Sequence, residues 1–243
     1  MSEIKKENFS YSKLEQYVNC PFAYKLKYID KKFYGTDTLI TLLGTLLHSV
    51  EEKISLSLRE GKSPNYDELI DYLHNVNIPK KSPFDTEGGI YGLNILKDRF
   101  PTEYYEPSLK TGLSYFNKVA SYINNIRRQE EFMLAHPELE IWDVEHPFLF
   151  EYSGHTMKGF IDRVLKYKGK DQYILQDIKT RDKVFPKEDV PTPLQFVVYS
   201  LALKQELKLA EEPSECSWDL ILIQELQQAG TKGFIGRGCK KLD

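Results

Sequence analysis

Cysteine is scarce in this chain, and long apolar runs are absent. The 243 residues include three cysteines, Cys20, Cys216 and Cys239, an odd number at irregular positions. Such a set predicts no disulfide framework and suits a reducing compartment. The longest apolar stretch, Leu39–Leu47, is broken by two threonines and a glycine and is too short to span a bilayer. We therefore expect a cytoplasmic protein without a membrane segment.

The chain also lacks repeats, low-complexity tracts and a strong excess of charge of one sign. Its first ten residues, MSEIKKENFS, are polar and have no apolar core of a signal peptide. A net charge of −3 argues against a protein that coats nucleic acid by bulk electrostatics, although a local basic groove remains compatible with it. With 41% hydrophobic and 28% charged residues, the composition is that of an ordinary globular protein. We expect a single domain over residues 1–243, with a mainly helical insertion at about 61–134.

A β-hairpin is predicted in the second half of the chain. Two β-rich runs, Phe160–Tyr167 and Gln172–Thr180, flank a polar turn with a glycine at its tip. If the strands are symmetric about that turn, paired residues have numbers that add to 339. This register places Asp162 opposite Asp177, with Lys179 on the same face as Asp177 because strand side chains alternate.

The two facing carboxylates need an explanation. At about 5 Å and an effective dielectric constant near 20, they repel each other by roughly 3 kcal/mol. A lysine offsets part of this repulsion, and a divalent cation between the carboxylates would offset far more. The alternative is a hairpin with scattered surface charges. Apolar residues on both faces of the hairpin, as in a strand covered on both sides, weigh against that alternative: Ile161, Val164, Leu165, Ile174, Leu175 and Ile178.

Other elements follow from hydrophobic periodicity and from capping and turn signals. Helices are expected from Ser12 (as the first residue of an S-x-x-E capping box) to Cys20, and over 39–59, 66–75, 93–99, 108–134 and 192–208. Strands are expected over 141–150, which carries Glu145, and over 217–224. Together with the hairpin these strands predict an α/β fold with a mixed central sheet of about four strands, flanked by helices.

Lysines alternate with aromatic residues in the stretch FAYKLKYIDKKFY, residues 22–34. Two interpretations are open. Basic residues interleaved with aromatics can line a nucleic-acid groove. An amphipathic helix with a solvated lysine face would have the same composition.

Several short motifs occur in an order that resembles a known family. They are Ser10-x-Ser12 and Cys20-Pro21, Gly44-x3-His48, Gly159-x2-Asp162-Arg163, Asp177-x-Lys179-Thr180 and Gln195-x3-Tyr199. This set resembles the RecB-like branch of the PD-(D/E)XK nuclease superfamily, over the front helices and nearly all of residues 140–223. Gln176 stands where the proline of the family's name would precede the second acid. The resemblance implies a restriction-endonuclease-like α/β core with a helical N-terminal part.

The resemblance also implies roles for individual residues. His48, Asp162, Asp177 and the backbone carbonyl of Ile178 would bind Mg²⁺ or Mn²⁺. Lys179 would position or activate the attacking water, and Gln195 and Tyr199 would contact the scissile phosphate or support Lys179. Glu145, on the neighbouring strand, is a weaker candidate for a second metal ion or for supporting the ligands.

Some RecB-like nucleases hold a [4Fe–4S] cluster through one N-terminal cysteine and three closely spaced C-terminal ones. Cys20 stands where the first would be, but Cys216 and Cys239 lie 23 residues apart and one ligand is missing. We therefore expect no iron–sulfur cluster.

The function expected is a Mg²⁺-dependent deoxyribonuclease, an exonuclease in recombination, repair or phage DNA processing. DNA would be the substrate, and a helicase or a single-strand annealing protein is a candidate partner. Two alternatives are a non-catalytic DNA-binding or scaffolding protein of the same fold, and a structure-specific endonuclease or RNA-directed enzyme. The oligomeric state is not readable from the sequence.

Overall fold

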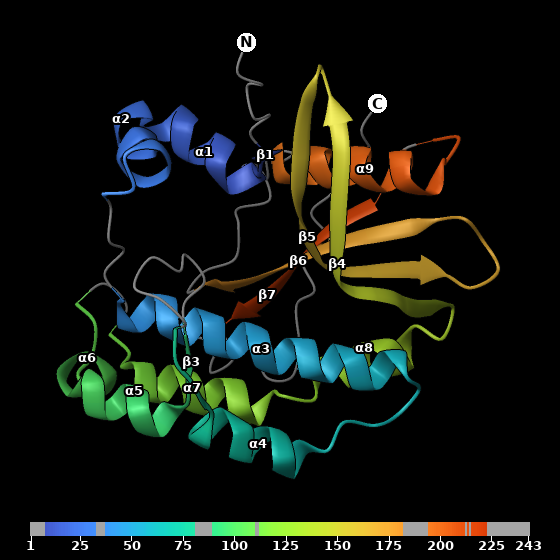
Figure 1. The fold of residues 1–243 in the computed structure, drawn as a ribbon. Helices are drawn as coiled ribbons and strands as arrows, with labels where there is room; N and C mark the ends of the chain where they lie inside the picture. Colours follow the sequence, from blue (N-terminus) through green and yellow to red (C-terminus); the bar gives the residue numbers. More distant parts are fainter. Residues whose placement is uncertain are drawn as a thin grey trace.

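A mixed β-sheet lies between helices in the computed structural model, which describes residues 8–32, 37–80, 89–109, 112–181, 194–211, 213 and 215–222 (Figure 1). Within the described residues the sheet has five strands: β1 (Asn8–Phe9), β4 (Leu139–Tyr152), β5 (His155–Tyr167), β6 (Tyr173–Arg181) and β7 (Glu215–Leu222). The prediction of an α/β fold with a mixed central sheet is confirmed. The strand predicted at 217–224 begins two residues earlier, and its last two residues lie outside the described part of the chain.

The helices are α1 (Tyr11–Asn19), α2 (Pro21–Tyr24), the π-helical turn η1 (Lys25–Ile29), α3 (Leu39–Arg59), α4 (Tyr66–Asn75), α5 (Leu93–Arg99), α6 (Pro101–Tyr105), α7 (Tyr115–Asn124), α8 (Arg128–Ala135) and α9 (Leu194–Leu207). A small antiparallel ribbon joins β2 (Asn77–Ile78) to β3 (Ile90–Tyr91). None of the described helices has both the length and the apolar character needed to cross a membrane.

The long hairpin of β4 and β5 forms one edge of the sheet. On its other edge β5 pairs with two strands at separate places: β1 runs parallel to it at Thr156 and Met157, and β6 runs antiparallel to it from Arg163 to Lys166. Between these partners the second edge of β5 has no described strand beside it over residues 158–162. β7 then pairs with β6 in parallel. The free stretch of the β5 edge is where Asp162 lies.

Two helices cover the two faces of the sheet. Successive side chains of β6 alternate between the faces: Ile178 packs in the apolar cluster of α3, and Asp177 bonds to Gln195 on α9. Apolar residues at helical spacing form a buried stripe along α3, with Leu43, Leu47, Val50 and Ile54 at most 1% exposed and Leu58 partly buried. Helices α4 to α7 pack against the other side of α3 (Figure 1).

Helices predicted at 39–59, 66–75 and 93–99 have those bounds in the structure. The predicted helix at 108–134 is wrong, since the structure has α7 and α8 there instead. Gly112, at φ +67°, cannot continue a helix, and Ser114 is the N-cap of α7, its Oγ accepting a hydrogen bond from the Asn117 N–H. Asn125 ends α7 and its side chain bonds to the Ser121 carbonyl.

The first helix also begins earlier than predicted. Ser10, not Ser12, is the N-cap of α1, because its Oγ accepts a hydrogen bond from the Lys13 N–H at 3.3 Å. Helix α9 is described from Leu194, so the predicted start at Thr192 lies outside the described residues, as do the loop after Arg181 and the C-terminal tail. The division into one domain with an insertion stays a prediction.

Candidate active site

The predicted register of the hairpin is confirmed up to the residues next to the two acids. β5 and β6 form four ladder pairs, of which Arg163 with Gln176 is the last. One step further, the same register places Asp162 opposite Asp177. There the backbone ladder gives way to a side chain, since Asp162 Oδ2 accepts a hydrogen bond from the Ile178 N–H at 2.7 Å. The carboxylate therefore joins the two strands at the point where they separate.

Glu145 completes a row of three acids across adjacent strands. Its two neighbours in β4 pair with the two neighbours of Asp162 in β5, so Glu145 lies opposite Asp162. Its backbone has φ +49°, in the left-handed region that a non-glycine residue in a strand rarely adopts. Such a conformation costs of order 1 kcal/mol or more and is commonest at functional sites.

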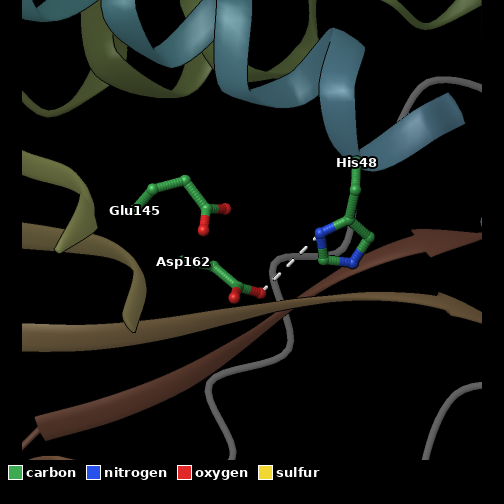
Figure 2. A group of neighbouring side chains, drawn as sticks. All are labelled: His48, Glu145 and Asp162. Atoms are coloured by element: carbon green, nitrogen blue, oxygen red, sulfur yellow. Dashed lines mark ion pairs between the residues drawn. The ribbon is translucent and has the colours of Figure 1, made fainter. Parts of the chain in front are cut away.

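His48 approaches this row from α3 (Figure 2). Its Nδ1 lies 4.0 Å from Asp162 Oδ2, and one ligand atom each from His48, Glu145 and Asp162 lie within 4.8 Å of one another. Figure 2 shows the three side chains converging from the helix and two strands. Glu145 was the weaker candidate from the sequence because strand pairing alone does not indicate how close it comes to His48.

A divalent cation fits this donor set. Hard cations bind carboxylate oxygens at about 2.0–2.6 Å, so ligand atoms on one ion lie up to about 4–5 Å apart, in agreement with the observed spread of 4.8 Å. Imidazole nitrogen and carboxylate oxygen are also ligands of Mn²⁺. The three side chains are partly buried, which leaves access for a substrate.

Asp177 is almost fully buried and holds three other predicted site residues together. Lys179 Nζ lies 2.6 Å from its Oδ2, and Gln195 Nε2 donates to its Oδ1 at 2.6 Å. The same amide nitrogen lies 2.7 Å from the hydroxyl oxygen of Tyr199. Gln195 and Tyr199 share a helix face, as their four-residue spacing predicts. Lys179, with a side chain 39% exposed, is the most accessible member of this group.

The carboxyl groups of Glu145 and Asp177 have raised pKa values. Burial, and then the charge of Asp162, raise the pKa of Asp177 to about 7 against the opposing effects of Lys179 and Gln195. Burial, and then the charges of Asp162, Glu52 and Asp177, raise the pKa of Glu145 to about 7. Without a cation, the site therefore disfavours carrying all its negative charges at once, which is the electrostatic problem that the sequence indicated.

A buried polar network beside the site was not predicted. Arg163 donates to Gln176 Oε1 at 2.7 Å and pairs with Asp219 of β7. Arg128 of α8 lies between Asp219 and Glu51 of α3, with Nη1 2.7 Å from Glu51 Oε1. The network ties together the elements that carry His48, Asp162 and Asp177. A signal was present in the sequence, because Glu51 interrupts the apolar stripe of α3.

The pKa of Asp219 shows how this network balances its charges. Burial alone raises the pKa of this carboxyl, but the guanidinium groups of Arg128 and Arg163 outweigh burial and hold the pKa below its usual value. Asp219 is therefore ionised in the folded protein.

A family comparison decides which of the known folds this arrangement represents. The model of the PD-(D/E)XK nuclease superfamily matches residues 8–233. The chain belongs to this superfamily. The resemblance inferred from the spacing of the motifs is confirmed.

Two curated relatives are similar to this PD-(D/E)XK chain. They are the ATP-dependent helicase/deoxyribonuclease subunits of Thermoanaerobacter sp. (strain X514) and of Thermoanaerobacter pseudethanolicus, each 29% identical over 207 residues, or 79% of this chain. The match covers 17% of each relative, so the chain spans about a sixth of their length. A crystal structure of a candidate exonuclease from Eubacterium rectale matches 88% of this chain and 66% of that one, with a TM-score of 0.43 and 14% identity.

The residues predicted for the site lie in two adjoining groups. His48, Asp162 and Glu145 form the first, and Asp177 with its partners Lys179, Gln195 and Tyr199 forms the second. The Ile178 N–H bonds to Asp162, while a role for its carbonyl stays a prediction.

Cys20 is exposed and its Sγ accepts a hydrogen bond from the Ala23 N–H. The side chains of the other two cysteines lie outside the described part of the chain, and the expected absence of an iron–sulfur cluster stays a prediction.

Proposed function

We propose that this chain is a Mg²⁺- or Mn²⁺-dependent deoxyribonuclease, acting as an exonuclease in recombination, repair or phage DNA processing. The observation that carries the proposal is the convergence of His48, Glu145 and Asp162 beside the ion pair of Asp177 and Lys179. Membership of a nuclease superfamily and the deoxyribonuclease named in the curated relatives support it.

In this proposal His48, Asp162, Asp177 and the Ile178 carbonyl hold the cation, and Glu145 is a further ligand. A bound cation would polarise a phosphoryl oxygen and lower the pKa of water. The raised pKa values of Glu145 and Asp177 support the assignment, since a cation would stabilise the ionised carboxylates that burial and the neighbouring negative charges disfavour. Besides binding the cation, Asp162 would hold β5 and β6 together at this point, because its carboxylate accepts a hydrogen bond from the Ile178 N–H.

Lys179 would orient the attacking water and neutralise charge that develops on the phosphate. Asp177 holds its ammonium group in place at 2.6 Å, so this cation is already positioned before substrate binds. Positioned charges of this kind typically contribute a hundredfold to a thousandfold in rate.

Gln195 and Tyr199 would hold the carboxylate of Asp177 in place. Gln195 donates to the carboxylate and contacts the Tyr199 hydroxyl, which leaves Asp177 Oδ2 oriented towards Lys179. Because both side chains lie beside Asp177, either of them could instead contact the scissile phosphate directly.

The proposal is tested by incubating the purified chain with linear and with circular DNA, with Mg²⁺, Mn²⁺ or EDTA. Asp177→Ala should abolish cleavage, and Lys179→Ala should slow it by about a hundredfold to a thousandfold. Asp171→Ala is the matched control, because Asp171 lies in the turn of the same hairpin with a side chain 84% exposed. Cleavage that persists in EDTA or in Asp177→Ala would refute the proposal.

The same assay separates the alternatives. Binding of DNA without hydrolysis in either metal would favour a non-catalytic DNA-binding protein, and nicking of the circular DNA would favour an endonuclease. We also propose a helicase as a partner, since the curated relatives are named as helicase/deoxyribonuclease subunits. Residues 61–134 would be an insertion in a single nuclease domain. The protein would act in the cytoplasm.

A further inference from the structure

The N-terminal helical segment, which we define as residues 11–32 with α1, α2 and η1, exposes an unusual amount of apolar surface. Tyr17 is 55% exposed, Val18 75%, Phe22 66% and Ile29 62%. Single exposed apolar residues are ordinary, but four within thirteen positions of the chain are more than that and are consistent with an interaction surface.

Aromatic rings within this segment form a row. Tyr17 meets Tyr24 edge to face with ring centroids 5.4 Å apart, and Tyr24 contacts Tyr28 at 5.1 Å. Tyr24 is buried and packs against both neighbours, of which Tyr17 is 55% exposed and Tyr28 is partly buried. The row therefore presents ring surface on a rigid base.

The segment is basic although the whole chain is acidic. It contains five lysines and two acids, a net charge of +3, whereas the chain carries −3. The ammonium groups of Lys13 and Lys27 lie 5.4 Å and 5.2 Å from the centre of the Tyr28 ring. Cations and aromatic surface therefore occur together. This combination suits a partner that has both negative charges and flat apolar groups.

A π-helical turn shapes the middle of this surface. In η1 the Asp30 N–H bonds to the Lys25 carbonyl at 2.9 Å, five residues back. Such turns are rare and are frequent at functional sites.

The segment also adjoins the candidate active site. Helix α1 contacts α9 and β5, the elements that carry Gln195 and Asp162 (Figure 1). The segment therefore lies next to two of the elements on which the candidate active site is built.

We propose that the N-terminal helical segment binds single-stranded DNA leading to or from the active site, with bases stacked on Tyr17 and Phe22 and phosphates paired with Lys25 and Lys27. The proposal rests on the nuclease function and names the form of its substrate. A single strand is favoured over a duplex because paired bases stack on one another and leave no face for an exposed ring. A purely apolar protein partner would have no need for the lysines.

Binding is measured by fluorescence anisotropy of a labelled 15-nucleotide oligothymidylate in EDTA, where the proposed nuclease cannot cut it. Tyr17→Ala and Phe22→Ala should each raise Kd about tenfold, the size of one lost stacking contact. The slope of log K against log salt is negative, and the double variant Lys25→Ala/Lys27→Ala should make it shallower by about 1.4, or 0.7 for each lost phosphate contact. Circular dichroism and the melting temperature check folding of every variant.

Two matched controls lie elsewhere on the surface. Tyr105→Ala removes a ring that is 53% exposed on α6, and Lys62→Ala removes a lysine after the end of α3. Both should bind the oligonucleotide like the unaltered chain. Unchanged Kd in all the segment variants, or no binding by the unaltered chain, would overturn the proposal. Equal losses with a blunt duplex would overturn the single-strand assignment.

A small phosphodiester separates this proposal from the proposed function. The p-nitrophenyl ester of thymidine 5′-monophosphate occupies only the cation site, so with Mn²⁺ its hydrolysis should be the same in segment variants and in the unaltered chain. On long single-stranded DNA the variants should show a raised KM with unchanged kcat. If the unaltered chain hydrolyses neither substrate, the nuclease function fails, while the anisotropy measurement still tests the binding surface.

Discussion

The carboxylate of Asp162 accepts a hydrogen bond from the Ile178 N–H at 2.7 Å, at the point where β5 and β6 part. One side chain thus has two tasks: it closes the end of a strand ladder and offers an oxygen to the candidate cation site. The two tasks can be separated by substitution, because an amide oxygen accepts the same hydrogen bond without the negative charge.

Asp162→Asn should keep the fold and lose the cation. We expect its free energy of unfolding in EDTA to equal or exceed that of the unaltered chain, since repulsion with Asp177 is removed. Asp162→Ala should be less stable than Asp162→Asn by about 1–2 kcal/mol, because the Ile178 N–H loses its acceptor. Urea denaturation measures both. Equal stability of the two variants would show that the hydrogen bond contributes nothing.

Backbone strain at Glu145 makes a second prediction. At φ +49° a glycine is less strained than an alanine, so Glu145→Gly should be more stable than Glu145→Ala by about 1 kcal/mol. Both variants should bind Mn²⁺ more weakly, as isothermal titration calorimetry can measure. A more stable alanine variant would contradict the inferred strain, and unaltered Mn²⁺ affinity would remove Glu145 from the ligand set.

Cation binding should stabilise the fold. A ligand at a hundred times its dissociation constant adds about 2.7 kcal/mol to the free energy of unfolding. Mg²⁺ or Mn²⁺ should therefore raise the melting temperature of the unaltered chain, and His48→Ala should lose most of the shift. His136→Ala is the control, since His136 ends α8 and pairs with Glu138. The same shift in His48→Ala would contradict the assignment of His48 as a ligand.

Replacement of Lys179 should affect catalysis more than substrate binding. We expect Lys179→Met to lower kcat by about a hundredfold to a thousandfold with little change in KM for DNA. Lys170→Met, in the turn of the same hairpin, should leave both constants unchanged. A raised KM at constant kcat would instead make Lys179 a DNA-binding residue.

The lowered pKa of the Asp219 carboxyl group leads to a prediction of how the free energy of unfolding depends on pH. Its pKa in the folded state lies below the ordinary value, so its ionised form contributes stability above the unfolded pKa of about 4, and this contribution is lost as pH falls towards the folded pKa. Asp219→Asn should cost about 3 kcal/mol at pH 7, because Arg128 and Arg163 lose a buried partner. It should also flatten the decline in stability between about pH 5 and pH 3, as measured by urea denaturation. An equally steep decline would assign acid sensitivity to other groups.

Local sequence was sufficient to predict the hairpin register and the bounds of α3. The glycine-containing turn was sufficient for the hairpin register, because strands that are symmetric about it pair Val164 with Leu175, as observed. Capping and periodicity likewise determined the bounds of α3. These features depend on residues close in sequence, whose geometry the backbone restricts.

Local patterns failed where two local signals competed. Apolar residues at helical spacing over 108–134 indicated one helix, but Gly112 and Asn125 interrupt it, and two of those apolar residues, Leu109 and Phe116, are exposed. Periodicity alone does not reveal which of its apolar residues will find a partner.

Only the tertiary structure decided how the distant parts meet. The parallel pairing of β7 with β6, the approach of Glu145 to His48, and the bonds from Arg128 to Glu51 and Asp219 join residues that are far apart along the chain. Their positions depend on how α3 packs against the sheet, and no periodicity encodes that packing. The motifs therefore sufficed to indicate the acids, the histidine and the lysine, whereas their common site required the folded chain.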